Sequence, residues 1–323
     1  MAVILLGLAY LGTRGQPPTQ NSPVEKLRIA LPVLPHTMLV HVAAAKGYFT
    51  DEGLDVSILP VSHGVAAISD VLQEKADLAV AADVPFVISV MQGGAIGMVA
   101  SLVVSNDNAI IARRDHAIAA PRDLAGKKIG VSFGTAGSYF LRAFLIRHRL
   151  PPGAIVLVDL PPDRIVAALA NGSVDAVATW QPISFEAQAA LGKNALSFTQ
   201  SDAYMNTMVA VGRSEFLKGH ADAIEKFVRA MLKAEQFTQS HPKDTLNLAA
   251  EWLKIDVDAL RPTWKQFDFS VNLLQSQLIT LEDEARWAMA RGYAAKGPVP
   301  NFLPHLYLDA LLAVQPERVT VLH

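Results

Sequence analysis

From residue 27 onward, the chain alternates short, mostly apolar runs with longer segments that are apolar on one side only. The short runs predict strands, at residues 27–32, 55–61 and 78–82. The amphipathic segments between them predict helices, at residues 38–46 and 64–76. The run LAVAA at 78–82 is too apolar to be exposed on either face, which is typical of a parallel sheet covered by helices.

The next stretch, residues 84–106, is long and uncharged but is interrupted by Pro85, Gln92 and the sequence GGAIG. These breaks predict a buried helix, a turn and a strand in place of a membrane span. The runs at 97–105 and 109–113 predict two strands, and the SNDN between them resembles a hairpin turn.

A second alternating unit follows, with the same style of element. Strands are predicted at 128–132, 154–160 and 175–179, with helices at 136–147 and 162–171. From residue 206 a strand, NTMVAVG, leads into mainly helical sequence at 221–239, 243–253, 256–267, 281–291 and 307–313. A helical tail after two α/β units is easiest to place if it wraps the first unit. We therefore expect an α/β protein of two lobes: 27–111, an inserted lobe at 112–208, and a return at 209–323.

The segment VSFGTAGSYFLRAFL, at 131–145, runs from an apolar strand through a turn of small residues into a helix. Gly134 and Gly137 allow close approach of the backbone, and the helix start supplies free N–H groups that favour a small anion. Thr135 and Ser138 either donate to such a ligand or cap the helix. If they bind ligand, alanine at both positions weakens binding with little loss of stability.

The composition of the chain argues against several classes of function. The chain of 323 residues has 28 basic and 30 acidic residues without blocks of like charge, so neither a nucleic-acid surface nor a polybasic membrane patch is indicated. It has no cysteine, which excludes thiolate catalysis and disulfides. We expect no metal or other cofactor, because His36 and His63 have no partner at a ligand spacing. The acidic residues in Asp51–Glu52 and at 282–284 are adjacent, so they do not form an acid/base pair.

The N-terminus begins with an apolar run at 2–11, followed by a segment rich in Pro, Gln, Asn and Ser up to residue 26. The run is too short to span a bilayer but has the length of a secretion-signal core, although it lacks a basic leader. We expect an exported protein, with residues 1–26 serving as a signal-like segment and linker or as a tether.

Four fragments in order carry a resemblance to a known family: GYFTDEGLDVSILPV, SHGVAAISDVLQEKADLAVAADVP, DLAGKKIGVSFGTAGSYFL and VDAVATWQP. Together they resemble the solute-binding proteins of ABC importers for nitrate, taurine and aliphatic sulfonates. The resemblance implies a periplasmic binding protein type II fold, with each lobe a mixed sheet flanked by helices. It also implies a monomer that holds a small anion between its lobes and docks on a membrane permease.

The resemblance also places candidate ligand-binding residues. They follow strand ends or open helices, and they are Pro35, His36, Thr37, Ser62, His63, Gly64, Ala82, Asp83, Gly134, Thr135, Ala136, Ser138, Trp180 and Gln181. At Gln181 the family commonly has an acid, so the resemblance gives weaker support for a cationic amine on the ligand. Asp83 is the remaining candidate for such a group, and Trp180 would supply an apolar wall.

Two further functions stay open at this stage, and a third is excluded by composition. One is binding of a pyrimidine or thiamine precursor, or of an aromatic acid. Another is a ligand-sensing module that signals through a membrane partner. The third is an enzyme of the kind of the fungal thiamine-pyrimidine synthases, which resemble these importer proteins, but their cysteine-rich motif has no counterpart in a chain without cysteine.

Overall fold

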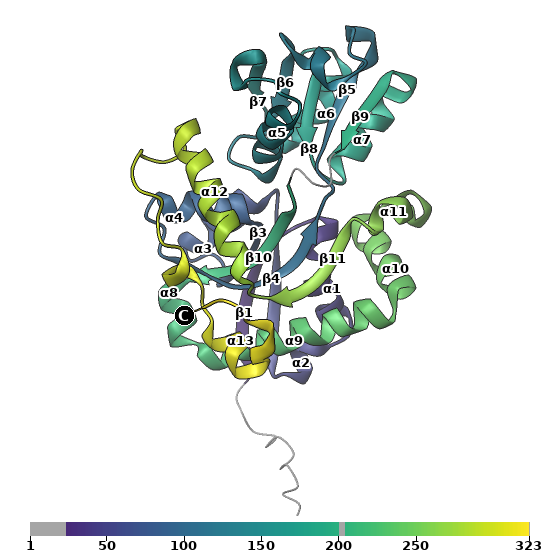
Figure 1. The fold of residues 1–323 in the computed structure, drawn as a ribbon. Helices are drawn as coiled ribbons and strands as arrows, with labels where there is room; N and C mark the ends of the chain where they lie inside the picture. The colour runs from purple at the N-terminus through teal and green to yellow at the C-terminus, as the bar shows by residue number, and fades with distance from the viewer. Residues whose placement is uncertain (1–23, 200–203, 323) are drawn as a thin grey trace, which may run out of the picture.

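The computed structural model describes residues 24–199 and 204–322, which form two lobes, each built around a mixed β-sheet (Figure 1). Apart from its last three residues, the signal-like segment expected at 1–26 lies outside the described residues. The first strand already begins at Glu25. Over the two described ranges, we find no helix with the length and apolar character that a membrane crossing needs.

The lobe 1 sheet has six strands in the order β11-β4-β10-β3-β1-β2. Strands β1, β2 and β3 run parallel, whereas β10 is antiparallel to both β3 and β4, and β11 is antiparallel to β4. The bounds are β1 Glu25–Pro32, β2 Leu54–Val61, β3 Leu78–Ala82, β4 Ile96–Ser105, β10 Asn206–Arg213 and β11 Phe267–Asn272. Because β1, β2 and β3 are parallel, their carboxyl ends lie along one edge.

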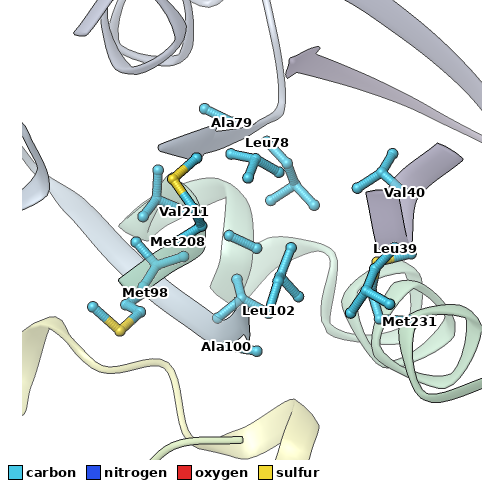
Figure 2. Packing of buried hydrophobic residues seen from close by; sticks show 14 of the residues in the cluster. Leu39, Val40, Leu78, Ala79, Met98, Ala100, Leu102, Met208, Val211 and Met231 are labelled. Atoms are coloured by element: carbon cyan, nitrogen blue, oxygen red, sulfur yellow. The ribbon is translucent and has the colours of Figure 1, made fainter. Parts of the chain in front are cut away.

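Helices cover both faces of this sheet, which explains why β3 and β4 are buried almost throughout. Figure 2 shows side chains of α1, β3, β4, β10 and α9 packed together, among them Leu39, Leu78, Met98, Met208 and Met231. The helices of lobe 1 are α1 Met38–Ala45, α2 Tyr48–Asp51, α3 Gly64–Leu72, α4 Asp83–Met91, α8 Ser214–Gly219, α9 Ala221–Ser240, α10 Pro242–Leu253, α11 Val257–Trp264, α12 Gln275–Arg291 and α13 Asp309–Val314.

The lobe 2 sheet has five strands in the order β7-β6-β8-β5-β9, with β6, β7 and β8 parallel and β5 antiparallel to its neighbours. The bounds are β5 Ala109–Arg113, β6 Lys128–Val131, β7 Val156–Asp159, β8 Ala176–Thr179 and β9 Ala195–Thr199. The helices are α5 Ala136–Arg147, α6 Pro162–Ala170 and α7 Ile183–Leu191. Single-turn 3₁₀ helices occur at Pro35–Thr37 (η1), Arg114–His116, Pro121–Leu124, Pro152–Ala154, Gly192–Asn194, Leu303–His305 and Pro316–Arg318.

Alternate residues of β5 supply the two apolar clusters of lobe 2. Ala109 and Ile111 pack on the side of α6 and α7, whereas Ile110 and Ala112 pack on the side of α5. The α5 cluster also includes Trp287 of α12 and Val84 of α4, both of which belong to lobe 1 by chain order. The two lobes therefore share an apolar contact.

The SNDN sequence is a crossover between the sheets, so the hairpin expected there is wrong. Strand β4 pairs with β10 and β11, while β5 pairs with β8 and β9. Within this crossover Asp107 and Asn108 are buried, and both oxygens of Asp107 accept hydrogen bonds from other segments. Buried polar side chains with partners in remote segments fix this crossover, and a local turn pattern does not reveal such partners.

The boundaries expected at 111/112 and 208/209 fall inside β5 and β10. Strand membership puts the crossings between Ser105 and Ala109 and between Thr199 and Asn206. The division of the chain into separate domains stays a prediction.

Four elements differ from the sequence prediction. Residues 267–272 form strand β11, whereas the helical segment expected at 256–267 ends there and no element was expected at 268–280. Helix α12 begins at Gln275, six residues before the expected start. Helix α7 and strand β9, at 183–199, were not predicted at all. The aromatic and apolar side chains of FDFSVN are as compatible with a strand as with a helix. Pairing with β4 makes this segment a strand.

Candidate functional site

A small cavity lies between the carboxyl edges of the two sheets. Its volume is about 40 Å³, and its lining residues are Leu34, His36, His63, Gly64, Val65, Ala82, Pro85, Thr135, Ala136, Trp180, Asn206 and Met208. Seven of the fourteen candidate residues are in this lining. A wider cavity of about 370 Å³ shares Val65 and Pro85 with it and includes Gly134, so the two form an inner and an outer part of one cleft.

The loop after β1 supplies Leu34 and His36, while Pro35 and Thr37 stay outside the lining. Thr37 Oγ1 donates to the carbonyl oxygens of Pro32 and Leu34, at 3.1 and 2.8 Å, so its hydroxyl folds the loop. Pro35 begins the short helix η1. Both residues therefore position His36.

His36 is fully buried and belongs to a polar network at the crossover. Its Nε2 lies 3.0 Å from Asp107 Oδ1 and 3.1 Å from Ser105 Oγ, and Asp107 Oδ2 accepts from the Gln181 N–H at 2.9 Å. Burial raises the pKa of Asp107, but the charge of His36 and these hydrogen bonds outweigh it, so the net pKa is lowered. Asp107 is thus a carboxylate, and His36 Nδ1 has no partner among the described residues.

The N-terminus of α3 brings His63, Gly64 and Val65 to the cavity, whereas Ser62 is exposed outside it. The hydroxyl of Ser62 lies 2.7 Å from His63 Nδ1. Partial burial lowers the pKa of His63, so its ring is neutral at pH 7.

The N-terminus of α4 follows β3 directly, and Ala82 lines the cavity. Asp83 does not: its carboxylate accepts from the Tyr204 hydroxyl and from the N–H groups of Val84 and Thr207, at 3.0 and 3.3 Å for the latter two. The Asp83 carboxylate is therefore engaged by the protein itself and lies outside the cavity lining.

The N-terminus of α5 brings Thr135 and Ala136 to the inner cavity. Thr135 Oγ1 donates to the Ser132 carbonyl at 2.6 Å, and Ser138 Oγ donates to the Thr135 carbonyl at 2.8 Å while accepting from the Thr135 N–H. The Ser138 hydroxyl therefore bonds to the backbone of the N-cap residue, whereas the Thr135 hydroxyl bonds within the preceding turn. Gly134 has a left-handed φ of +69°, which favours glycine.

Trp180 follows β8 and packs on the first turn of α5. A Cβ at Gly137 would lie 3.3 Å from two atoms of the Trp180 ring, so this glycine makes room for the indole and not for a ligand. Trp180 lines the cavity, and its Nε1 has no partner among the described residues. Gln181 contributes its backbone N–H to Asp107 and stays out of the lining.

Sequence reasoning missed five of the lining residues: Leu34, Val65, Pro85, Asn206 and Met208. Asn206 is buried at the start of β10; its Nδ2 lies 3.5 Å from Ser105 Oγ, and its Oδ1 has no partner among the described residues. A polar residue opening an otherwise apolar strand is the one signal that could have found it.

The chemistry of the inner cavity favours an anion or a neutral acceptor. Three helix N-termini, of α3, α4 and α5, meet there, and each offers N–H groups without an intrahelical acceptor. The lining includes no acidic residue and no lysine or arginine. Within residues 24–199 and 204–322, no group of three or more histidine or acidic residues is placed to hold a metal ion.

Comparison with known proteins gives a family match and several relatives in sequence. Residues 35–245 match the family described as NMT1/THI5 like. A Bacillus subtilis (strain 168) protein, whose name assigns it to aliphatic sulfonate binding, is 25% identical over 294 residues, covering 88% of this chain and 86% of its own length.

Solved structures are similar in fold. The alkanesulfonate-binding protein SsuA from Xanthomonas axonopodis pv. citri, solved bound to MOPS, has a TM-score of 0.77 at 17% identity, covering 89% of this chain and 99% of that chain. The periplasmic nitrate-binding protein NrtA from Synechocystis PCC 6803 has a TM-score of 0.76 at 13% identity, covering 93% of both. The two-lobed fold expected from the sequence is confirmed, and the chain belongs to the NMT1/THI5-like family of proteins with the periplasmic binding protein fold.

Proposed function

We propose that this protein is the extracytoplasmic solute-binding component of an ABC importer and that it holds a small anion, a sulfonate, a taurine-like compound or nitrate, in the cleft between its lobes. The observation that carries the proposal is the inner cavity, where three helix N-termini converge and no acidic side chain is present. The names of the matched relatives support the same ligand class.

Neutral donors are sufficient for such a ligand. The Trp180 indole N–H is free to donate, and the first turns of α3, α4 and α5 supply backbone N–H groups. Charge-assisted hydrogen bonds contribute about 1.5–3 kcal/mol each, so three or four approach the roughly 8 kcal/mol of a micromolar site before ordering costs. The Trp180 ring would face a short apolar group on the ligand.

The ligand can be identified by a thermal-shift panel of taurine, alkanesulfonates, aryl sulfonates, nitrate, bicarbonate and pyrimidine precursors. We expect a saturable shift from at least one anion, followed by calorimetry to obtain its Kd. A response to pyrimidine precursors alone would contradict the anion assignment and favour a precursor-binding protein.

The position of the ligand is tested by Val65→Trp. Val65 is 41% exposed and lines both parts of the cleft, so an indole there should obstruct the cleft with little effect on folding. Binding of the identified anion should weaken at least tenfold. The matched control is Val33→Trp, at a valine that is 42% exposed and outside the lining, and it should bind as the wild type does.

The importer role needs its own test. The liganded protein should stimulate ATP hydrolysis by its permease reconstituted in proteoliposomes, and should elute as a monomer. Anion binding without any stimulation would favour a sensor that signals through a different membrane partner.

A further inference from the structure

A second cavity lies beside the outer part of the cleft, where α12 meets lobe 2, and it shares no lining residue with the inner cavity. Its volume is about 170 Å³, and its walls are Val131, Phe133, Ser138, Leu141, Arg142, Leu145, Ile155, Leu157, Trp287, Ala290, Arg291 and Tyr293. Its lining residues come from in and around β6, β7 and α5 on one side and from the C-terminal half of α12 and Tyr293 on the other. Figure 1 shows α12 reaching from lobe 1 toward lobe 2. Phe133 and Tyr293 separate it from the outer cleft, because these two rings line both spaces and meet edge to face at 6.4 Å.

The interior of this cavity is apolar and partly aromatic. Aliphatic side chains such as Leu141 and Leu157 form one wall, and the Trp287 ring forms part of another. An enclosed apolar space of about 150 Å³ is enough to bind benzene. A cavity of 170 Å³ therefore has room for a single six-membered ring.

The charged residues in the lining are both cationic. Arg142 lies on α5 and Arg291 at the end of α12, and no acidic residue is in the lining. The Arg142 guanidinium lies 3.9 Å from Asp283, whose carboxylate also accepts from the Tyr139 hydroxyl, so this ion pair is a loose one. Arg291 contacts the Tyr293 side chain. Two guanidinium groups next to an apolar space suit a molecule with one anionic end and one apolar end.

We propose that this cavity is a second ligand site, for a monocyclic aryl carboxylate or an anion of the same shape and charge. The ring would occupy the apolar interior, and the carboxylate would lie between Arg142 and Arg291. This inference does not depend on the importer function, because the two sites share no lining residue of the inner cleft. An occupant would touch both α5 and α12, and would therefore favour the arrangement of the lobes seen in this structure.

Titration calorimetry of the full protein with phenylacetate tests the proposal. We expect saturable binding to the wild type, and at least tenfold weaker binding to Arg142→Gln/Arg291→Gln. The matched control Arg114→Gln/Arg286→Gln removes the same formal charge from exposed positions outside the cavity and should bind as the wild type does. Phenylacetamide, which has the ring but no charge, should bind at least tenfold more weakly than phenylacetate.

A second pair of variants tests the location through shape. Ala290 is exposed at the cavity rim on α12, so Ala290→Trp should fill the space and abolish binding without disturbing the core. Ile279→Trp, at a residue of α12 that is 67% exposed, is its control.

Three results would overturn the proposal. They are no saturable binding of phenylacetate at millimolar concentration, equal affinity in Ala290→Trp and Ile279→Trp, or loss of phenylacetate binding in the cleft variant Val65→Trp. The last result would place phenylacetate in the cleft, so the failure of this inference can be distinguished from failure of the proposed cleft function.

Discussion

Two hydroxyls at the start of α5 show how much a single residue's role depends on its surroundings. From the sequence, Thr135 and Ser138 suit a helix cap, with binding to a ligand as the alternative. In the structure Thr135 Oγ1 donates to Ser132 and Ser138 Oγ bonds both polar backbone atoms of Thr135. Any donor to an anion at this turn is therefore backbone N–H, with Thr135 and Ser138 holding the turn in place.

We accordingly expect Ser138→Ala to lower the free energy of unfolding by roughly 0.5–1.5 kcal/mol, because a buried N–H and a carbonyl lose their shared partner. Urea denaturation measures the difference. Ser276→Ala, at an exposed serine in the first turn of α12, is the matched control and should change little. If Ser138→Ala retains full stability and loses anion affinity, the hydroxyl acts on the ligand and the capping role is refuted.

At the scale of elements, helix α12 contacts both lobes, which the periodicity of its sequence does not predict. It packs on α4 of lobe 1, and its Trp287 belongs to the apolar cluster of lobe 2. Between α12 and α4, Glu284 and Asp83 are buried side by side, with Tyr204 bonded to Asp83 and Tyr139 bonded to the neighbouring Asp283.

This acidic pair gives stability a definite pH dependence. Burial raises the pKa of Asp83 to about 6, and burial with the nearby Asp83 charge raises the pKa of Glu284 well above its usual range. A carboxyl group that keeps its proton in the folded state lowers stability as pH rises above its unfolded pKa of about 4.

Glu284→Gln should therefore stabilise the protein by at least about 1 kcal/mol at pH 8 and make little difference at pH 4. Thermal melts across this pH range measure the effect. Glu282→Gln, on the same helix and half exposed, should show no such trend. A Glu284→Gln variant that is no more stable at pH 8 than at pH 4, relative to wild type, would contradict the buried-pair explanation.

At the scale of the whole molecule, a buried polar network at the first crossover joins the two lobes. Asp107, in the first crossover, accepts from His36 of lobe 1 and from Gln181 of lobe 2. Asn206, directly after the second, lies near Ser105 of the first. A buried carboxylate thus connects the site, the crossover and both lobes.

Asp107→Asn should lower stability at pH 7 by about 3–5 kcal/mol, because buried donors lose their anionic acceptor. The pKa of Asp107 is lowered in the folded protein, so its contribution is complete above pH 4 and is lost as pH falls through the folded pKa. Denaturation curves at several pH values should show that the difference in unfolding free energy between wild type and variant disappears only in acid. If this difference disappears instead between pH 5 and 8, another titrating group causes the effect.

The sequence by itself determined the local order of this protein: alternating strands and helices, two similar α/β units, a turn of small residues before α5, and the absence of cysteine chemistry. These follow from the periodicity of nearby side chains and from composition, which need no knowledge of distant contacts. The resemblance of four ordered fragments added the family.

Only the tertiary structure decided which strands pair and which polar groups meet. Pairing turned the SNDN sequence into a crossover, brought Asn206 beside Ser105 across a hundred residues, and turned Asp83 toward Tyr204. Whether a buried polar side chain is satisfied or free depends on partners supplied by remote segments, so no local pattern encodes it. The cavity between α5 and α12 is likewise formed by residues that are far apart in the sequence, so no local pattern could predict it.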